Sequence, residues 1–190
     1  MLRRRIVSAL FAPLDIASLV AFRVAFGALM VVAISRYFAY DWIGQFFVTP
    51  RLFFPYPGLE WIVPLPAPAM YGLFAALGVA AFCVTIGAWY RPAILLFCLG
   101  FTYVHLIDRT NYLNHYYLIS LLSALLVFLP LDRAGSLDAW RRPASRTATA
   151  PAWMVWLLRF QLAVVYVFGA VAKLNPDWLR EKGLLEDGMF

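Results

Sequence analysis

The sequence predicts an all-α fold, a multi-pass transmembrane helical bundle of about five spans with a cytoplasmic N-terminus. Of its 190 residues, 64% are hydrophobic and 17% are aromatic, whereas only 14% are charged. A soluble domain of this length is nearer half apolar and a quarter charged. One small core cannot hide the excess apolar surface, so we expect much of it to face the lipid bilayer.

The net charge of +6 does not indicate a nucleic-acid partner. The basic residues lie in short runs between apolar stretches, as positive-inside flanks of membrane spans do. No cluster of Lys and Arg lies on a soluble face, so we predict no nucleic-acid binding. Cys83 and Cys98 fall inside apolar stretches without the Cys/His spacing of a metal site, so no metal is predicted.

Hydropathy predicts the spans at residues 16–36, 69–89, 92–107, 115–130 and 153–173. Asp15 is a plausible N-cap for the first span, and Pro92 suits the first turn of the third. The first apolar stretch is long enough to cross a bilayer and no clear cleavage site follows it, so we expect a retained helix rather than a signal peptide. The third and fourth spans are short for a hydrocarbon core of about 30 Å.

The distribution of arginines predicts the orientation. With the N-terminus inside, the inner segments hold Arg3, Arg4, Arg5, Arg91, Arg133, Arg141, Arg142 and Arg146. The outer loops before the tail hold only Arg51 and Arg109, with Arg36 at the border. This asymmetry follows the positive-inside rule. It places 37–68, 108–114 and the tail after Lys173 outside, and makes 131–152 an inner linker.

The outer loop 37–68 is unusually aromatic for an exposed connection. Its large aromatic residues are Trp42, Phe46, Phe47, Phe53, Phe54, Tyr56 and Trp61. Aromatic side chains at this density favour either the mouth of a site for a hydrophobic ligand or an interfacial belt without a ligand. The sequence does not separate the two interpretations.

A polar run joins the third and fourth spans, from Asp108 to His115. Polar groups at membrane depth are costly and are therefore functional candidates. Asn114 offers donors and an acceptor, and a neutral His115 offers one of each, so together they suit a quinol oxygen or an oxyanion. The alternative is a loop that hydrogen-bonds to itself and caps the fourth helix.

Lys173 ends the fifth span, where a lysine usually extends to water. One helical face carries Tyr166, Gly169, Ala170 and Lys173, because their spacing is i, i+3, i+4 and i+7. The small residues form a notch that suits a ligand ring or the close approach of another helix. If Lys173 is buried, its amine loses a proton more readily and becomes a usable base.

Arg23 in the first span and Gln161 in the fifth lie at similar depth, about 12 Å from the inner ends at 1.5 Å per residue. We expect them to hydrogen-bond across the helices in a structural role, because an intramembrane arginine needs a partner.

Several segments carry a resemblance to a known family. They are Asp15, Ala17-Ser18-Leu19, Phe22-Arg23, Phe26-Gly27, Asp108-Arg109-Thr110, Asn114-His115-Tyr116, Arg159-Phe160-Gln161, Tyr166 and Lys173-Leu174-Asn175-Pro176-Asp177-Trp178. In this order and hydropathic setting they resemble the vitamin K-dependent γ-carboxylase family and its bacterial relatives, which share the horizontally transferred transmembrane (HTTM) domain. The similarity runs from about residue 13 to 178.

The resemblance implies an enzyme that couples oxidation of a reduced quinone to carboxylation of peptide glutamate. In the family, a lysine deprotonates reduced vitamin K, which reacts with O₂ to give a strongly basic alkoxide. That base removes a glutamate γ-proton, and the carbanion takes up CO₂. The resemblance implies that Lys173 is the base and contacts the quinone. It also implies that Asn114 and His115 take part in catalysis and bind the quinone. We expect Tyr166 to lie beside the quinone as well. Reduced vitamin K or a related hydroquinone is the expected cofactor, and a peptide or protein glutamate the expected substrate.

We therefore expect an HTTM-type transmembrane domain at 1–179 in a bacterial inner membrane, with its site toward the extracytoplasmic face. The charged tail at 180–190 does not align, and carboxylases of the family continue into a large peptide-binding domain, which suits a fragment or a truncated frame. Two other functions stay open. One is a non-catalytic HTTM membrane module, and the other is a quinone-binding redox subunit without carboxylation.

Overall fold

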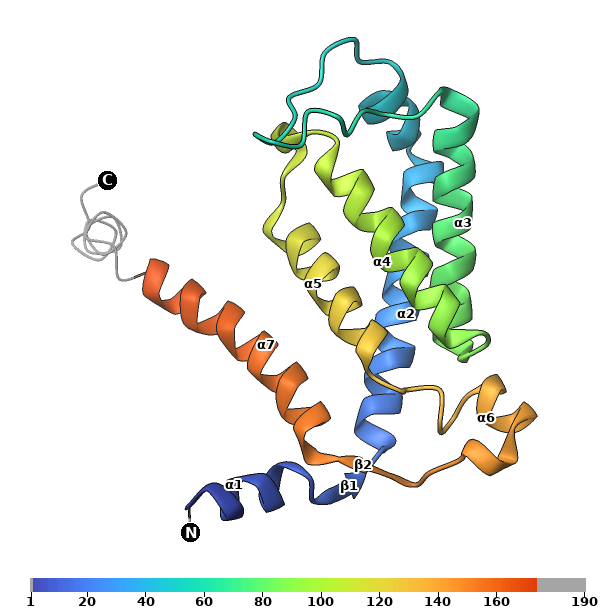
Figure 1. Ribbon diagram of the computed structural model, residues 1–190. Coiled ribbons are helices and arrows are strands. Elements are labelled where there is room, and N and C mark those ends of the chain that lie inside the picture. The colour runs from blue at the N-terminus through green and yellow to red at the C-terminus, as the bar shows by residue number, and fades with distance from the viewer. Residues whose placement is uncertain (1, 174–190) are drawn as a thin grey trace, which may run out of the picture.

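The computed structural model of the chain describes residues 2–173, and these form a mostly helical structure (Figure 1). Its α-helices are α1 (Leu2–Leu10), α2 (Ala17–Ala39), α3 (Ala67–Ile86), α4 (Tyr90–Leu106), α5 (Asn114–Phe128), α6 (Leu137–Arg141) and α7 (Ala152–Ala172). Short turns of other helix types are η1 (Gly44–Val48), η2 (Arg109–Asn111) and η3 (Pro143–Ser145). Two three-residue strands, β1 (Pro13–Asp15) and β2 (Thr149–Pro151), complete the elements.

Each predicted span is a helix in the structure, which confirms the helical fold. Three helices, α2, α3 and α7, are long and apolar enough to cross a membrane. The helices α4 and α5 are apolar but shorter, with 17 and 15 residues. Their lengths agree with the short third and fourth spans that the sequence predicted.

The helices α2, α3, α4 and α5 pack side by side and hold most of the apolar core (Figure 1). Gly27 allows α2 and α3 to approach closely, because a Cβ at this position would lie 2.7 Å from the backbone nitrogen of Thr85. Small residues at such crossings let helix backbones approach within a membrane, where packing rather than water exclusion holds helices together.

The turn between α3 and α4 contains backbone conformations that were not predicted from the sequence. Gly87 ends α3 in the left-handed region with φ 65°, and its amide donates to the carbonyl of Val84. The carboxylate of Asp138 accepts from the amides of Trp89 and Tyr90, at 3.0 and 2.9 Å. An acidic side chain from α6 therefore caps the N-terminus of α4, which satisfies amides that have no partner within the helix.

The strands β1 and β2 form an antiparallel pair in which Leu14 lies opposite Ala150. This pairing joins the segment before α2 to the segment before α7. The N-cap residue of α2 is Ile16 rather than the predicted Asp15. Asp15 lies one residue earlier, in β1, and its carboxylate accepts a hydrogen bond from the amide of Ala17 at 2.8 Å.

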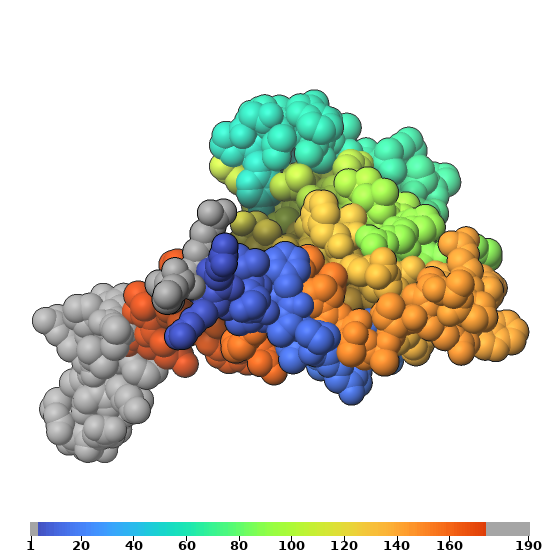
Figure 2. Space-filling model, turned by 60° about the horizontal axis from the view of Figure 1, so that its bottom comes forward, coloured from blue at the N-terminus to red at the C-terminus, as the bar shows by residue number. Residues whose placement is uncertain are grey.

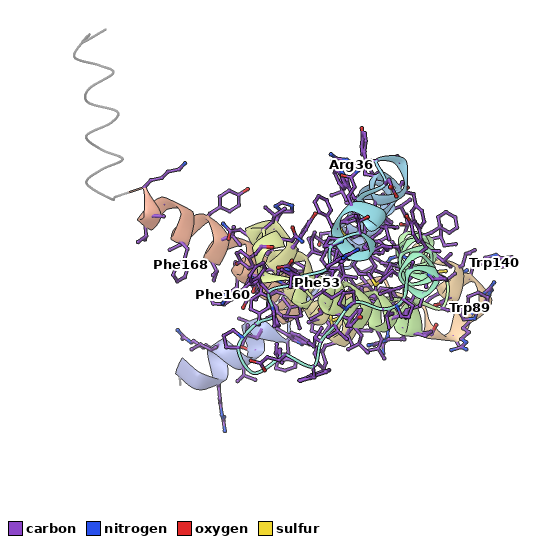
Figure 3. All side chains as sticks on the ribbon, turned by 90° about the horizontal axis from the view of Figure 1, so that it is seen from above. Arg36, Phe53, Trp89, Trp140, Phe160 and Phe168 are labelled. Carbon is purple, nitrogen blue, oxygen red and sulfur yellow. The ribbon has the colours of Figure 1, made fainter. Side chains whose placement is uncertain are left out.

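The helix α7 leans away from the four packed helices along most of its length (Figure 1). Its buried residues, Ala152, Met154, Val155 and Leu158, all lie in its first two turns. Further along, apolar side chains such as Phe160 and Phe168 are exposed, and Figure 3 shows both on the part of α7 farthest from Trp89 and Trp140.

Candidate functional site

The polar run between α4 and α5 is a turn held by its own first residue. The carboxylate of Asp108 accepts from the amide of Thr110 at 2.9 Å and from its hydroxyl at 2.7 Å. This self-bonded turn is one of the two arrangements that the sequence left open. It does not extend to the end of the run, because α5 begins without a side-chain cap.

Asn114 and His115 are the first two residues of α5, and both are exposed. Neither side chain forms a hydrogen bond within residues 2–173. The imidazole of His115 packs edge-on against the ring of Tyr116, with 4.7 Å between ring centroids. The capping alternative is thus absent for these two side chains, and their polar atoms are available to a ligand.

A groove of about 780 Å³ lies between α5 and α7 and includes both residues. Its apolar lining includes Leu118 and Leu121 from α5 and Val164 and Phe168 from α7. Its polar lining includes Asn114, His115 and Gln161 as well as the tyrosines Tyr112 and Tyr117. The small residues Gly169 and Ala172 of α7 line the same groove. A volume of this size, apolar with a few polar groups, is typical of ligand pockets.

Lys173 follows Ala172 directly, so the predicted base stands at the end of α7 beside the groove. Its backbone amide donates to the carbonyl of Ala170 at 3.1 Å, and its side chain is exposed. Tyr166 is 79% exposed. Neither residue lines the groove, whereas Gly169 from the same predicted face does. The structure therefore brings Asn114 and His115 together with the small-residue notch, and leaves Tyr166 and Lys173 outside its lining.

The predicted pairing of Arg23 with Gln161 is wrong. Arg23 is completely buried, and its terminal nitrogens donate to the carbonyls of Val84, at 3.2 Å, and Gly135, at 2.5 Å. Gln161 instead lines the groove between α5 and α7. The physical reason is that the Arg23 side chain lies next to the end of α3 and to the loop after α5, where the carbonyl of Val84 has room for a second donor and that of Gly135 accepts directly.

A second cavity was not predicted. It has a volume of about 200 Å³ and is lined by residues 110–113, of which only Tyr112 also lines the groove. His105, which is 8% exposed, lines it together with Tyr37 and Tyr116, whose hydroxyls are 2.8 Å apart. The sequence feature that could have indicated this cavity is His105 itself, a histidine near the end of an apolar span and three residues before Asp108.

Aromatic residues of the loop 37–68 line two different cavities. Phe46 and Phe47 line the cavity of His105, whereas Trp61 is 75% exposed beside a groove between α4 and α5. Tyr56 lines that same groove, and its hydroxyl has no partner in the described part of the chain. Burial raises the pKa of the Tyr56 phenol, and nearby Tyr112 adds to the effect, so the hydroxyl remains protonated.

Comparison with known protein families identifies the family of the chain. The family model described as HTTM domain matches residues 11–186. No solved structure matches the chain. The matched region includes Leu174 to Trp178 of the lysine motif, which lie outside the described residues, as does the tail 180–190. Because the match covers nearly the whole sequence, with its polar run, its groove helices and Lys173, the chain belongs to the HTTM domain family.

Proposed function

We propose that this membrane protein binds a hydroquinone in the groove between α5 and α7 and uses it to carboxylate peptide glutamate. The observation that supports the proposal is the shared groove, which Asn114 and His115 line together with Gly169 and Ala172, the residue before Lys173. HTTM domains occur in vitamin K-dependent carboxylases, and the motif residues of this chain resemble that family.

The groove suits the chemistry of a quinone with an apolar tail. Its apolar side chains, among them Leu118, Leu121, Val165 and Phe168, offer contact to a ring and to hydrocarbon. Two of its polar side chains, Asn114 and His115, lie where α5 begins, and Gln161 lies near the middle of α7. A ring oxygen placed at the beginning of α5 would be able to exchange hydrogen bonds with the amide of Asn114 and with the imidazole of His115.

Lys173 is the proposed base that takes a proton from the hydroquinone hydroxyl. In the described structure its amine is exposed, and an exposed ammonium holds its proton firmly. The proposal therefore requires an apolar ligand or another part of the protein to cover the end of α7. Such cover would exclude water and favour the neutral amine. The reduced quinone supplies, with O₂, the strong base that the reaction on glutamate and CO₂ requires.

The proposal includes five spans with the N-terminus inside a bacterial inner membrane, so that the groove opens toward the extracytoplasmic side. The arginine distribution supports this orientation. The beginning of α5 and the end of α7 are both the helix ends that lie away from β1 and β2 (Figure 1), and residues of both line one groove.

A binding measurement on the purified chain in lipid nanodiscs tests the site. We expect Asn114→Ala and His115→Ala each to weaken vitamin K hydroquinone binding about tenfold, which corresponds to about 1.4 kcal/mol for a lost hydrogen bond. Gly169→Trp places a large side chain at a position that lines the groove and has open space around a Cβ, and it should abolish binding. Asn111→Ala is the matched control, because Asn111 lines the other cavity. Equal affinities of the Asn111→Ala and Asn114→Ala proteins would refute the site.

A turnover measurement then tests the reaction. The chain is supplied with reduced vitamin K, O₂, labelled CO₂ and a glutamate peptide, and we expect quinone epoxide and fixed label. Lys173→Ala should abolish both products while hydroquinone binding stays within about threefold, because the lysine acts on the proton rather than on affinity. Binding with electron transfer and no epoxide would indicate a redox subunit instead. A folded protein that neither binds nor turns over would indicate a non-catalytic module.

A further inference from the structure

A groove at the end of the molecule that carries the N-terminus is lined by two arginines from segments that are distant in sequence. Arg133 follows α5 and Arg146 follows η3, and the groove between them has a volume of about 410 Å³. Figure 2 views this end, where α1 (blue) and the segment 131–151 (orange) share the surface. The proposed hydroquinone groove, near the start of α5, does not include either arginine.

Backbone hydrogen bonds fix the two arginines next to each other. The amide of Thr147 donates to the carbonyl of Arg133 at 3.2 Å, which joins the two segments. The Nε of Arg146 donates to the carbonyl of Ala139 at 2.8 Å, which orients this guanidinium. Its terminal nitrogens, and the whole guanidinium of Arg133, form no hydrogen bond in the described part of the chain. The oriented guanidinium of Arg146 and the unbonded one of Arg133 offer N–H donors that suit a phosphate, which arginines bind through paired N–H groups.

No acidic side chain lines this groove among the residues that the structure describes. The nearby carboxylates have other partners or other neighbours. Asp138 caps α4, Asp15 accepts from Ala17, and the Oδ1 of Asp132 is buried. The arginine charges in the groove are therefore not neutralised by ion pairs, and an anion is the complementary ligand.

The surroundings of the groove are those of a membrane interface. Trp89 and Trp140 are 65% and 69% exposed at this end, and Figure 3 shows them close together. The guanidinium of Arg141 lies 5.3 Å from the ring centroid of Trp89. Exposed tryptophans are typical of the headgroup level of a bilayer. The helix α1 runs across the same end (Figure 1) and exposes Arg4 and Arg5 together with apolar side chains, as helices that lie on a membrane surface do.

An adjoining groove runs along the start of α2. It shares Ala134, Gly135 and Ala148 with the arginine groove, and its other lining residues are Asp15, Ile16, Ala17, Val20 and Ala21. We propose that Arg133 and Arg146 bind the phosphate of an anionic phospholipid, whose acyl chains lie along α2. This assignment goes beyond the proposed reaction and does not depend on it.

Binding of dioleoyl phosphatidylglycerol to the full chain in detergent, followed by native mass spectrometry, tests the assignment. We expect phosphatidylglycerol to bind in preference to phosphatidylcholine of the same chain length. Arg133→Gln should weaken phosphatidylglycerol binding about fivefold, because one basic residue near an anionic surface contributes about 1 kcal/mol. Arg133→Lys, which keeps the charge, should stay within about twofold of the unmodified chain.

Two controls keep the outcome decisive. Arg51→Gln removes an exposed arginine from the opposite end and should leave phosphatidylglycerol binding unchanged. The side chain of Arg133 is exposed, so the melting temperature of Arg133→Gln in phosphatidylcholine should match that of the unmodified chain. Equal binding of the two lipids, or equal loss in Arg51→Gln, would overturn the proposal. So would equal binding of glycerophosphoglycerol, which lacks acyl chains and would indicate a site for soluble phosphate esters.

Discussion

Arg23 illustrates how a single charged residue is accommodated inside the bundle. Its guanidinium is fully buried, and two carbonyls, of Val84 and Gly135, accept its hydrogen bonds. Gly87 makes room for it, because a Cβ there would lie 2.0 Å from an Arg23 terminal nitrogen. The residue therefore ties α2 to the end of α3 and to the loop after α5.

Replacing Arg23 by methionine removes this tie while keeping an apolar side chain of similar length. We expect Arg23→Met to lower the free energy of unfolding by about 2 kcal/mol, because two carbonyls lose a charged donor. Arg36→Met on the same helix is the control. Arg36 is exposed and its guanidinium lies 5.2 Å from the Trp42 ring centroid, a contribution of about 0.5–1 kcal/mol. Unfolding in sodium dodecyl sulfate measures both, and a loss no larger than that of Arg36→Met would contradict the role.

At the same scale, the candidate site could be predicted only in part. Asn114 and His115 were identifiable because polar groups are rare near membrane spans, and the groove includes both. The sequence could not indicate that Arg23 bonds to carbonyls rather than to Gln161, because every residue carries a carbonyl and only the fold determines which are free. His105 was missed for a related reason, since its cavity depends on how Tyr37 and Phe47 pack around it.

Among the elements, the contact between α2 and α3 depends on a glycine. A Cβ at Gly27 would lie 2.5 Å from the hydroxyl of Thr85 and 2.9 Å from its Cα. Because backbone atoms cannot move aside without moving the helix, Gly27→Ala should lower the free energy of unfolding by about 1–3 kcal/mol.

Gly72→Ala provides the matched control for this contact. Gly72 lies in α3, and nothing is within 4 Å of a Cβ built there. The added methyl group should leave stability unchanged or raise it slightly, because alanine favours a helix over glycine by up to about 1 kcal/mol. Equal unfolding free energies for the Gly27→Ala and Gly72→Ala proteins would show that α2 and α3 do not approach closely at Gly27.

The helices were predictable from hydropathy to within a few residues, whereas the segments between them were not. The span predicted at 92–107 is α4 at Tyr90–Leu106, extended at its start because Asp138 caps it from α6. That cap joins residues 48 positions apart, and the pair of strands β1 and β2 joins more distant segments still. Such pairings depend on the arrangement of the helices, and a short polar linker does not reveal them.

For the molecule as a whole, the arginine distribution predicts an N-terminus inside and five spans. Single cysteines introduced at Gly58 in the outer loop and at Ser145 in η3, with Cys83 and Cys98 replaced by alanine, test this topology. In intact bacterial spheroplasts, a membrane-impermeant maleimide should label the cysteine at 58, and the cysteine at 145 only after permeabilisation. The reverse pattern would show the opposite orientation. Labelling of both cysteines before permeabilisation would place residues 58 and 145 on the same side and contradict three spans between them.

The fold brings together residues that the chain separates by about fifty positions. The first turn of α5 and the last turns of α7 form one groove, although α7 is buried only near its beginning. A ligand between the two helices would bury apolar surface that the described structure leaves exposed. Because such burial is favourable, we expect ligand binding to shift α7 toward α5.

Photolabelling locates the ligand most directly. A vitamin K analogue with a photoreactive ring is bound to the chain in nanodiscs, irradiated, and mapped by mass spectrometry of the proteolysed protein. The account predicts adducts within 114–121 and 161–172, the residues that line the groove between α5 and α7, and predicts that excess unlabelled hydroquinone suppresses them. Saturable adducts confined to the groove around Trp61 and Leu99, or labelling that excess hydroquinone does not suppress, would contradict it.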